Sequence, residues 1–295
     1  MAPAPFAVAI ALRSLTVCVG SRTLVKRARA IVSLLPGSAT SLHRMDQRAK
    51  IGGLQSRFPL TRHSVVAAVR SAVPEVRERA VEVLVTAYWK PVYKYVRLRW
   101  RAPEEDAEDL TQGFFAEALT HGFFERYDPA RAKFRTYLRT CLHGFVANER
   151  KASRRLKRGG GARLLSLDFA SAEGELQRQA VRNDMDMDEY FHRECVRSLF
   201  AFAVDVLRER CERSGKDRQF SLFRRYDLEG DDVAPRPTYA ELAEEFDVSA
   251  VQVTNYLAAV RREFRKIVLE RMRELSGSEA EFRAEARELL GVTAR

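Results

Sequence analysis

The chain has 295 residues, of which 46% are hydrophobic, enough for two small domains with buried cores. Its 51 Lys and Arg residues outnumber its 40 Asp and Glu residues, and the resulting net charge of +11 favours a polyanionic partner such as nucleic acid. No stretch approaches the ~20 apolar residues of a membrane span, and the spacing of the four cysteines and five histidines indicates neither a disulfide framework nor a metal site. The sequence therefore predicts a chain without a cofactor or metal, in a reducing cytoplasm.

The N-terminal segment differs in charge from the rest of the chain. Its first 45 residues hold six basic residues and no acidic residue, so the remainder carries a net charge of only +5. Such a composition imitates an organellar transit peptide, and it also arises when DNA upstream of a gene is translated by mistake. We expect the second explanation, with Met45 as the true start, and we treat 1–55 as a disordered or mis-annotated extension.

Helical periodicity dominates from about residue 62, and no segment alternates with the period of a strand. We therefore expect an all-α fold. A glycine run at 159–161 ends a first helical block, which predicts a domain over 56–160, a flexible linker over 161–189, a second domain over 190–275 and a tail helix within 276–295. Because Pro91 cannot donate a hydrogen bond inside a helix but suits a first turn, we expect two helices to meet there.

The helix predicted to open at Pro103 begins with a dense acidic cluster: Glu104, Glu105, Asp106, Glu108 and Asp109. Carboxylates are favoured at the positive end of a helix dipole, so a solvated helix start explains part of this pattern. A two-metal phosphoesterase would need further inward-facing carboxylates, which the sequence does not offer. We favour a docking surface for a basic partner.

The next helix carries a strip of positive charge. Between Arg131 and Arg163, eleven basic residues stand against one acidic residue, Glu149. An apolar stripe at helical spacing is expected to be buried: Phe134, Leu138, Cys141, Leu142 and Phe145. The opposite face then presents Arg135, Arg139, His143 and Arg150. Because uncompensated like charges repel unless a polyanion relieves them, the strip indicates nucleic-acid contact.

Two capping boxes stand eleven residues apart, Thr238 with Glu241 and Ser249 with Gln252, and a turn at 246–249 separates the helices that they begin. This spacing is typical of a helix-turn-helix, although plain helical bundles also contain it. The second helix is expected to turn its polar face outward: Val251, Gln252, Thr254, Asn255, Ala258, Arg262, Arg265 and Lys266. Amides on such a face can read base edges, and cations can hold phosphates or guanine.

Three segments together resemble bacterial RNA polymerase sigma factors of the extracytoplasmic-function group, which retains sigma domains 2 and 4. The segments are 106–115, 134–160 and 238–266, and the resemblance spans about 60–275. It implies three sites. Core polymerase would bind Asp106, Asp109, Leu110, Gln112 and Phe115. The minus-ten element would bind Arg135, Tyr137, Arg139, Asn148, Arg150, Lys151, Arg154 and Arg155. The minus-thirty-five element would bind Gln252, Thr254, Asn255, Arg262, Arg265 and Lys266.

The resemblance implies promoter binding and melting without catalysis by this chain, with core RNA polymerase and promoter DNA as partners and an anti-sigma factor as a further candidate. Tyr127, Phe134 and Tyr137 are candidates for capping unstacked bases, and each is also a plausible core residue. The chain departs from the family pattern with Gly113 where Glu is common, Gly144 where Asn is common, and Asp247 where Gly is frequent. The competing interpretations are a stand-alone helix-turn-helix regulator and, more distantly, a helical phosphodiesterase.

Overall fold

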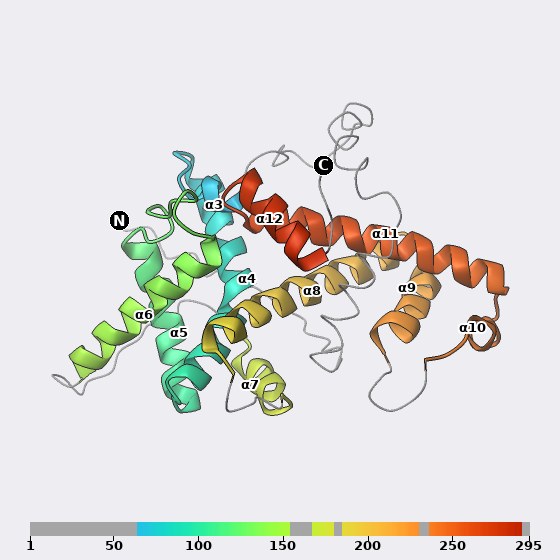
Figure 1. Cartoon of the computed structure of the whole chain (residues 1–295), viewed down its shortest axis with the longest axis horizontal. Helices are drawn as coiled ribbons and strands as arrows, with labels where there is room; N and C mark the ends of the chain where they lie inside the picture. The colour runs from blue at the N-terminus through green and yellow to red at the C-terminus, as the bar shows by residue number, and fades with distance from the viewer. Residues whose placement is uncertain (1–63, 154–166, 180–184, 230–235, 291–295) are drawn as a thin grey trace, which may run out of the picture. The chain divides into compact units, whose positions relative to one another are not determined.

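The computed structural model describes residues 64–153, 167–179, 185–229 and 236–290, and Figure 1 shows that these ranges fold into helices. No strand occurs within them, which confirms the all-α class. The helices are α3 (Val65–Ala68), α4 (Pro74–Arg99), α5 (Glu104–Thr120), α6 (Phe134–Ser153), α7 (Phe169–Gln177), α8 (Met187–Arg213), α9 (Asp217–Phe223), the π-helix η2 (Arg224–Leu228), α10 (Tyr239–Glu245), α11 (Ala250–Leu275) and α12 (Glu279–Leu290). Among them, none is both long and apolar enough to cross a membrane. The predicted extension 1–55 lies outside the described residues.

The chain forms two compact units. Unit 1 contains the described residues between Ala72 and Cys195, and unit 2 contains those from Val196 onward together with α3. From the sequence we expected the second domain to start at residue 190, and the first domain, 56–160, to include the segment that forms α3. In the structure, the first residues of α8 belong to unit 1 and the segment before α4 belongs to unit 2.

The expectation of a flexible linker over 161–189 needs correction in its middle part, because α7 folds there and packs against α4. The ring of Phe169 lies 5.5 Å from that of Trp89 and 5.1 Å from that of Tyr93. Glu173 accepts hydrogen bonds from the Tyr93 hydroxyl at 2.7 Å and from Nε of Arg97 at 2.9 Å. These contacts join residues about 80 positions apart, which local periodicity cannot reveal.

The predicted junction at Pro91 is also wrong, because α4 continues through it as one helix. A proline inside a helix removes one hydrogen bond and costs about 3 kcal/mol. Around Pro91, however, nearly every side chain is buried whichever way it points, including Tyr88, Trp89, Val92 and Tyr93. Fully burying such side chains contributes about 1.5–3 kcal/mol each, so packing outweighs the local penalty.

The core of unit 1 is formed by matched apolar faces of α4, α5 and α6. The expected stripe of α6 is present: Phe134, Leu138, Leu142 and Phe145 are buried, while Cys141 is half-buried. Gly113 lies where α5 approaches α6, and a Cβ added there would stand 3.1 Å from Cζ of Phe145. The glycine therefore permits a close helix contact that offsets its poor helix propensity.

Unit 2 is built around α11, whose inward side chains pack with the second part of α8, with α9 and with α12. The ring of Phe264 on α11 lies 6.3 Å from Phe200 on α8 and 5.6 Å from Phe223 on α9. Phe282 and Leu290 place α12 in the same core. The predicted tail helix is thus present and is part of the unit's packing.

A buried carboxylate fastens the segment before α10 to α11. Asp227, on the π-helix η2, is 1% exposed and accepts hydrogen bonds from Arg261 at 2.8 and 2.9 Å and from Arg236 at 3.0 Å. The Arg236 guanidinium also stacks 3.8 Å from the ring centre of Tyr226. A carboxylate this deeply buried requires such partners, because desolvation penalises a lone charge heavily.

Replacing Asp227 with Ala is expected to destabilise the protein by about 3 kcal/mol, because two guanidinium groups lose their buried anion. The matched control is Glu245→Ala, whose partner Arg225 is half exposed to solvent; its loss is expected to cost less than about 1 kcal/mol. Denaturant unfolding followed by far-UV circular dichroism measures both. Equal losses for the two variants would contradict the structural role of Asp227.

Gly113 and Gly144 both lie inside helices of unit 1, but a methyl group added at each position would meet different surroundings. A Cβ added at Gly144 would meet no atom within 4 Å, so Gly144→Ala is expected to stabilise the unit by about 0.4–1 kcal/mol. Gly113→Ala should gain less or lose stability, because its methyl meets the buried Phe145. Both tryptophans of the chain, Trp89 and Trp100, lie in unit 1, so fluorescence-detected unfolding reports this unit. Equal stabilisation by both variants would argue against the close contact at Gly113.

Candidate nucleic-acid and partner interfaces

The start of α5 presents an exposed acidic surface, as the sequence predicted. Ala107, Thr111, Phe114, Phe115 and Ala118 form its buried face. Glu104 is exposed in the first turn, and Glu105, Asp106 and Asp109 are exposed away from the buried face. Within the described residues, neither Asp106 nor Asp109 has a cation within ion-pair distance. Their charge is therefore offered to solvent or to a basic partner.

The apolar and amide residues assigned to polymerase binding lie differently. Leu110 and Gln112 are half-buried at the edge of this surface. Phe115 is fully buried, with its ring 5.2 Å from that of Phe114. The assignment of Phe115 to a contact surface is therefore corrected, because its side chain supports α5 from within the core.

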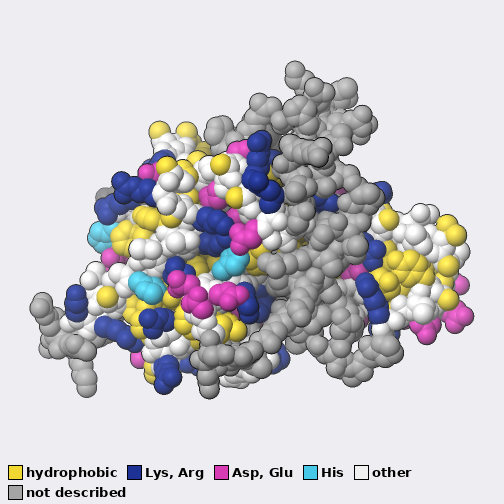
Figure 2. Space-filling model, in the orientation of Figure 1, with side chains coloured by type: hydrophobic (Ala, Val, Ile, Leu, Met, Phe, Trp, Pro, Cys, Tyr) yellow, Lys and Arg dark blue, Asp and Glu magenta, His cyan; other side chains and the backbone are white. Residues whose placement is uncertain are grey.

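The outer face of α6 combines small residues with cations. Asn148, Arg150 and Lys151 are exposed toward its end, beyond the bare Gly144. Figure 2 shows Lys and Arg side chains along the part of the surface where α6 lies in Figure 1. Arg154 and Arg155, also assigned to the minus-ten element, lie outside the described residues.

Part of this positive charge is already compensated inside unit 1. Arg139 is half-buried and forms an ion pair with Asp188 at 2.8 Å, and Arg135 is half-buried as well. Arg150 donates to the carbonyl of Trp100 at 3.3 Å but remains exposed. The sequence missed the pairing because Asp188 falls in the stretch interpreted as a linker. Arg150 and Lys151 are thus the more available candidates for binding a phosphate, and Arg139 would have to give up its carboxylate to bind one.

The three aromatic candidates belong mainly to the core. Phe134 and Tyr127 are buried, their rings 5.1 Å apart and edge to face, so a base-capping role for them is wrong for this structure. Tyr137 is half-buried against Tyr127 and donates its hydroxyl proton to the carbonyl of Phe123 at 2.7 Å. Burial, with a hydrogen bond to Cys141, raises the pKa of Tyr137 to about 12. Its phenol is thus already fixed by the protein.

In unit 2, α10 and α11 are joined by a short turn and both predicted capping boxes are present. The Thr238 hydroxyl accepts from the Glu241 N–H at 3.2 Å, and the Ser249 hydroxyl accepts from the Gln252 N–H at 3.2 Å. Asp247 in the turn has a φ of 50°, the left-handed conformation for which glycine is the usual residue. Asp tolerates this conformation better than most residues, so the turn closes despite the departure.

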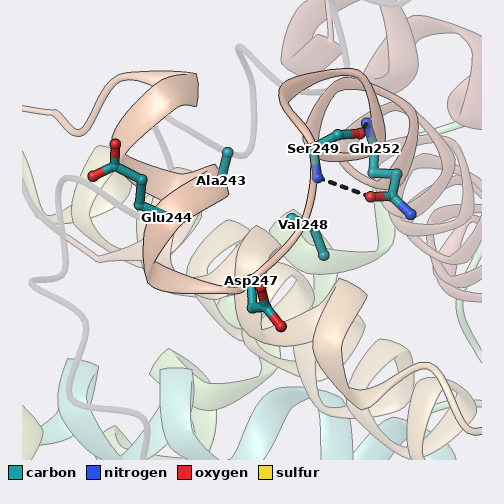
Figure 3. A pocket seen from close by; sticks show the side chains of 6 residues that line it. All are labelled: Ala243, Glu244, Asp247, Val248, Ser249 and Gln252. Carbon is teal, nitrogen blue, oxygen red and sulfur yellow. Dashed lines mark hydrogen bonds between the residues drawn. The ribbon is translucent and has the colours of Figure 1, made fainter.

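The polar face of α11 is exposed at its start. Gln252, Thr254 and Asn255 are all exposed, and Gln252 lines a shallow depression together with residues of α10 and the turn (Figure 3). The side-chain oxygen of Gln252 accepts from the Ser249 N–H at 2.8 Å, and Figure 3 shows its nitrogen turned away. In this conformation one lone pair of the Gln252 oxygen is taken by the cap and the oxygen is held toward Ser249, whereas the Asn255 amide is exposed with both its donor and its acceptor. A bidentate contact to adenine needs both functions, so it fits Asn255 better than Gln252.

Further along α11, Arg262 and Lys266 are exposed and Arg265 is half-buried. Lys266 lies 3.9 Å from Glu270, at the limit of an ion pair. Burial lowers the pKa of Arg265 below its usual value. Among the described residues, Arg262 is therefore the exposed cation of this set without a carboxylate at ion-pair distance.

The described residues contain no group of three or more His, Cys, Asp or Glu side chains placed to hold a metal ion. No curated protein and no solved structure matches the chain. Residues 84–156, about a quarter of the chain, match the family model described as Sigma-70 region 2. The matched range runs from within α4, through the acidic α5, to the basic end of α6. Sigma factors are DNA-binding initiation factors that catalyse no reaction themselves, and the match supports such a role for this chain in promoter recognition and transcription initiation.

Proposed function

We propose that this chain is a sigma factor of the extracytoplasmic-function group, which binds core RNA polymerase and directs promoter recognition and melting. The match to Sigma-70 region 2 carries the proposal. It is supported by the placement of uncompensated charge within the matched range, acidic on α5 and basic at the end of α6. A chain with this role acts where the polymerase is, in the cytoplasm.

In the proposed mechanism, the acidic face of α5 binds a basic surface of core polymerase through Asp106 and Asp109. Arg150 and Lys151 on α6, with the following Arg154 and Arg155, hold phosphates of the minus-ten element, and Asn148 contacts a base. Binding to phosphates supplies affinity but no sequence information, which has to come from base edges or DNA shape. The chain contributes binding energy and no bond-making step.

We further propose that α10 and α11 act as the helix-turn-helix that reads the minus-thirty-five element. The two capping boxes, the left-handed Asp247 and the exposed Asn255 support this assignment. Arg262, Arg265 and Lys266 would hold phosphates along the same helix. A stand-alone helix-turn-helix regulator would use the same helix pair but would leave the charged faces of α5 and α6 without a role.

Promoter-dependent run-off transcription with purified core polymerase separates these alternatives. A sigma factor co-elutes with the core enzyme and permits initiation, whereas a stand-alone regulator binds its operator without the polymerase. An anti-sigma factor remains a further candidate partner in this proposal.

The double reversal Asp106→Lys and Asp109→Lys is expected to abolish co-elution with core polymerase. Helical content should hardly change, because exposed charges near a helix start contribute only about 0.3–1 kcal/mol each. The matched control reverses Glu75 and Glu78, which are exposed and three residues apart near the start of α4. If the α5 reversal still co-elutes at moderate salt, or if the control fails equally, α5 is not the docking surface.

Two single substitutions should separate sequence preference from general affinity. Asn255→Ala is expected to relax preference among upstream-element variants and to cost about 1–3 kcal/mol on the preferred sequence. Lys151→Ala should weaken binding to every promoter, and the slope of log binding constant against log salt concentration should become shallower by about one. Open-complex formation on a set of promoter variants at two salt concentrations measures both effects. An unchanged ranking of upstream variants with Asn255→Ala would contradict the assignment of α11 as a reading helix.

A further inference from the structure

Val251 in the first turn of α11 is unusually exposed. The residue is 69% exposed, and Val73 is the other large hydrophobic residue that is exposed within the described ranges. Isolated apolar residues on a surface are common, so exposure alone indicates nothing. The position of Val251 is what distinguishes it, because it lies among the polar residues Gln252, Thr254 and Asn255 at the start of the proposed reading helix.

Neither the cap at the start of α11 nor its hydrophobic staple involves the Val251 side chain. Ser249 and Gln252 already cap the first turn. The positions that form a hydrophobic staple, one before the cap and four after it, are occupied by Val248 and Val253, which pack into the core of unit 2. Val251 is also β-branched, which restricts its rotamers inside a helix. Neither folding nor capping therefore accounts for a valine here.

The neighbours of Val251 define what could cover it. Asn255 lies four residues on and shares its face of the helix, and its amide is exposed. Arg262 and Lys266 add exposed cations further along the same helix. A surface that combines an amide, an apolar methyl pair and phosphate-binding cations is complementary to the major groove, where thymine alone presents a methyl group.

We propose that Val251 contacts the C5-methyl group of a thymine in the upstream promoter element and thereby contributes to its specificity. This inference rests on the proposed function of α11 as the reading helix. It adds an apolar determinant to the hydrogen bonds of Asn255. The contact would bury about one methyl group on each partner.

Replacing thymine with deoxyuridine tests the contact, because it removes the methyl group and leaves the hydrogen-bonding edge unchanged. The preferred upstream element is first selected from a randomised duplex library with the holoenzyme, formed from this chain and core RNA polymerase. Each thymine in that element is then replaced singly. For the wild type, replacement at one thymine is expected to weaken binding about fourfold, the loss of one buried methyl group.

The decisive comparison is a double-mutant cycle, in which the change in the protein and the change in the DNA are made singly and together. Val251→Ala should weaken binding to the thymine duplex and become insensitive to deoxyuridine at that position, whereas Val73→Ala should retain the wild-type sensitivity. If no thymine is sensitive, or if Val251→Ala keeps the full sensitivity, the proposed contact is wrong, whereas the assignment of α11 as a reading helix through Asn255 is unaffected. If selection yields no preferred upstream element at all, the assignment of α11 as a reading helix fails, and the contact fails with it.

Discussion

The ammonium group of Lys94 sets a constraint on which the arrangement of unit 1 depends. The residue is 1% exposed, in the part of α4 that is buried on every side. Removing a lone ammonium from water costs several kcal/mol, so it has to be met by anions. Glu175 of α7 lies 2.7 Å from Nζ and Glu194 of α8 lies 3.2 Å from it. Burial alone would raise the pKa of Glu175, but Lys94 and Lys90 hold it below its usual range.

This requirement explains why unit 1 extends well beyond the range that matches Sigma-70 region 2. Both carboxylates that meet Lys94 come from residues after the match ends at 156. The apolar contacts of Phe169 alone would hold α7 with little directional specificity, whereas ion pairs with Lys90, Lys94 and Arg97 fix its register on α4.

Features encoded within one helical turn could be predicted from the sequence. The buried stripe of α6, the acidic start of α5 and the two capping boxes all depend on residues three or four positions apart. Features that depend on distant residues could not be predicted. The continuity of α4 through Pro91, the docking of α7 and the burial of Phe115 arise from tertiary packing, which overrides local propensity. The basic strip likewise contains Arg139, and the sequence could not reveal that Asp188, 49 positions away, neutralises its charge. The assignments to polymerase and promoter remain predictions.

The division of the chain has a consequence for synthesis. Among the described residues, unit 1 runs from Ala72 to Cys195, whereas unit 2 takes α3 from before it and the residues from Val196 onward. Domains generally fold as units while the chain is made from its N-terminal end. A nascent chain can therefore complete unit 1 while α3 still lacks α11, the helix against which it packs. The apolar face of α11 in turn stays incomplete until α12 has been added. During that interval the chain would hold a folded unit 1, with the proposed polymerase and minus-ten sites, and an unfinished unit 2, with the proposed minus-thirty-five site, so the proposed sites would mature at different times.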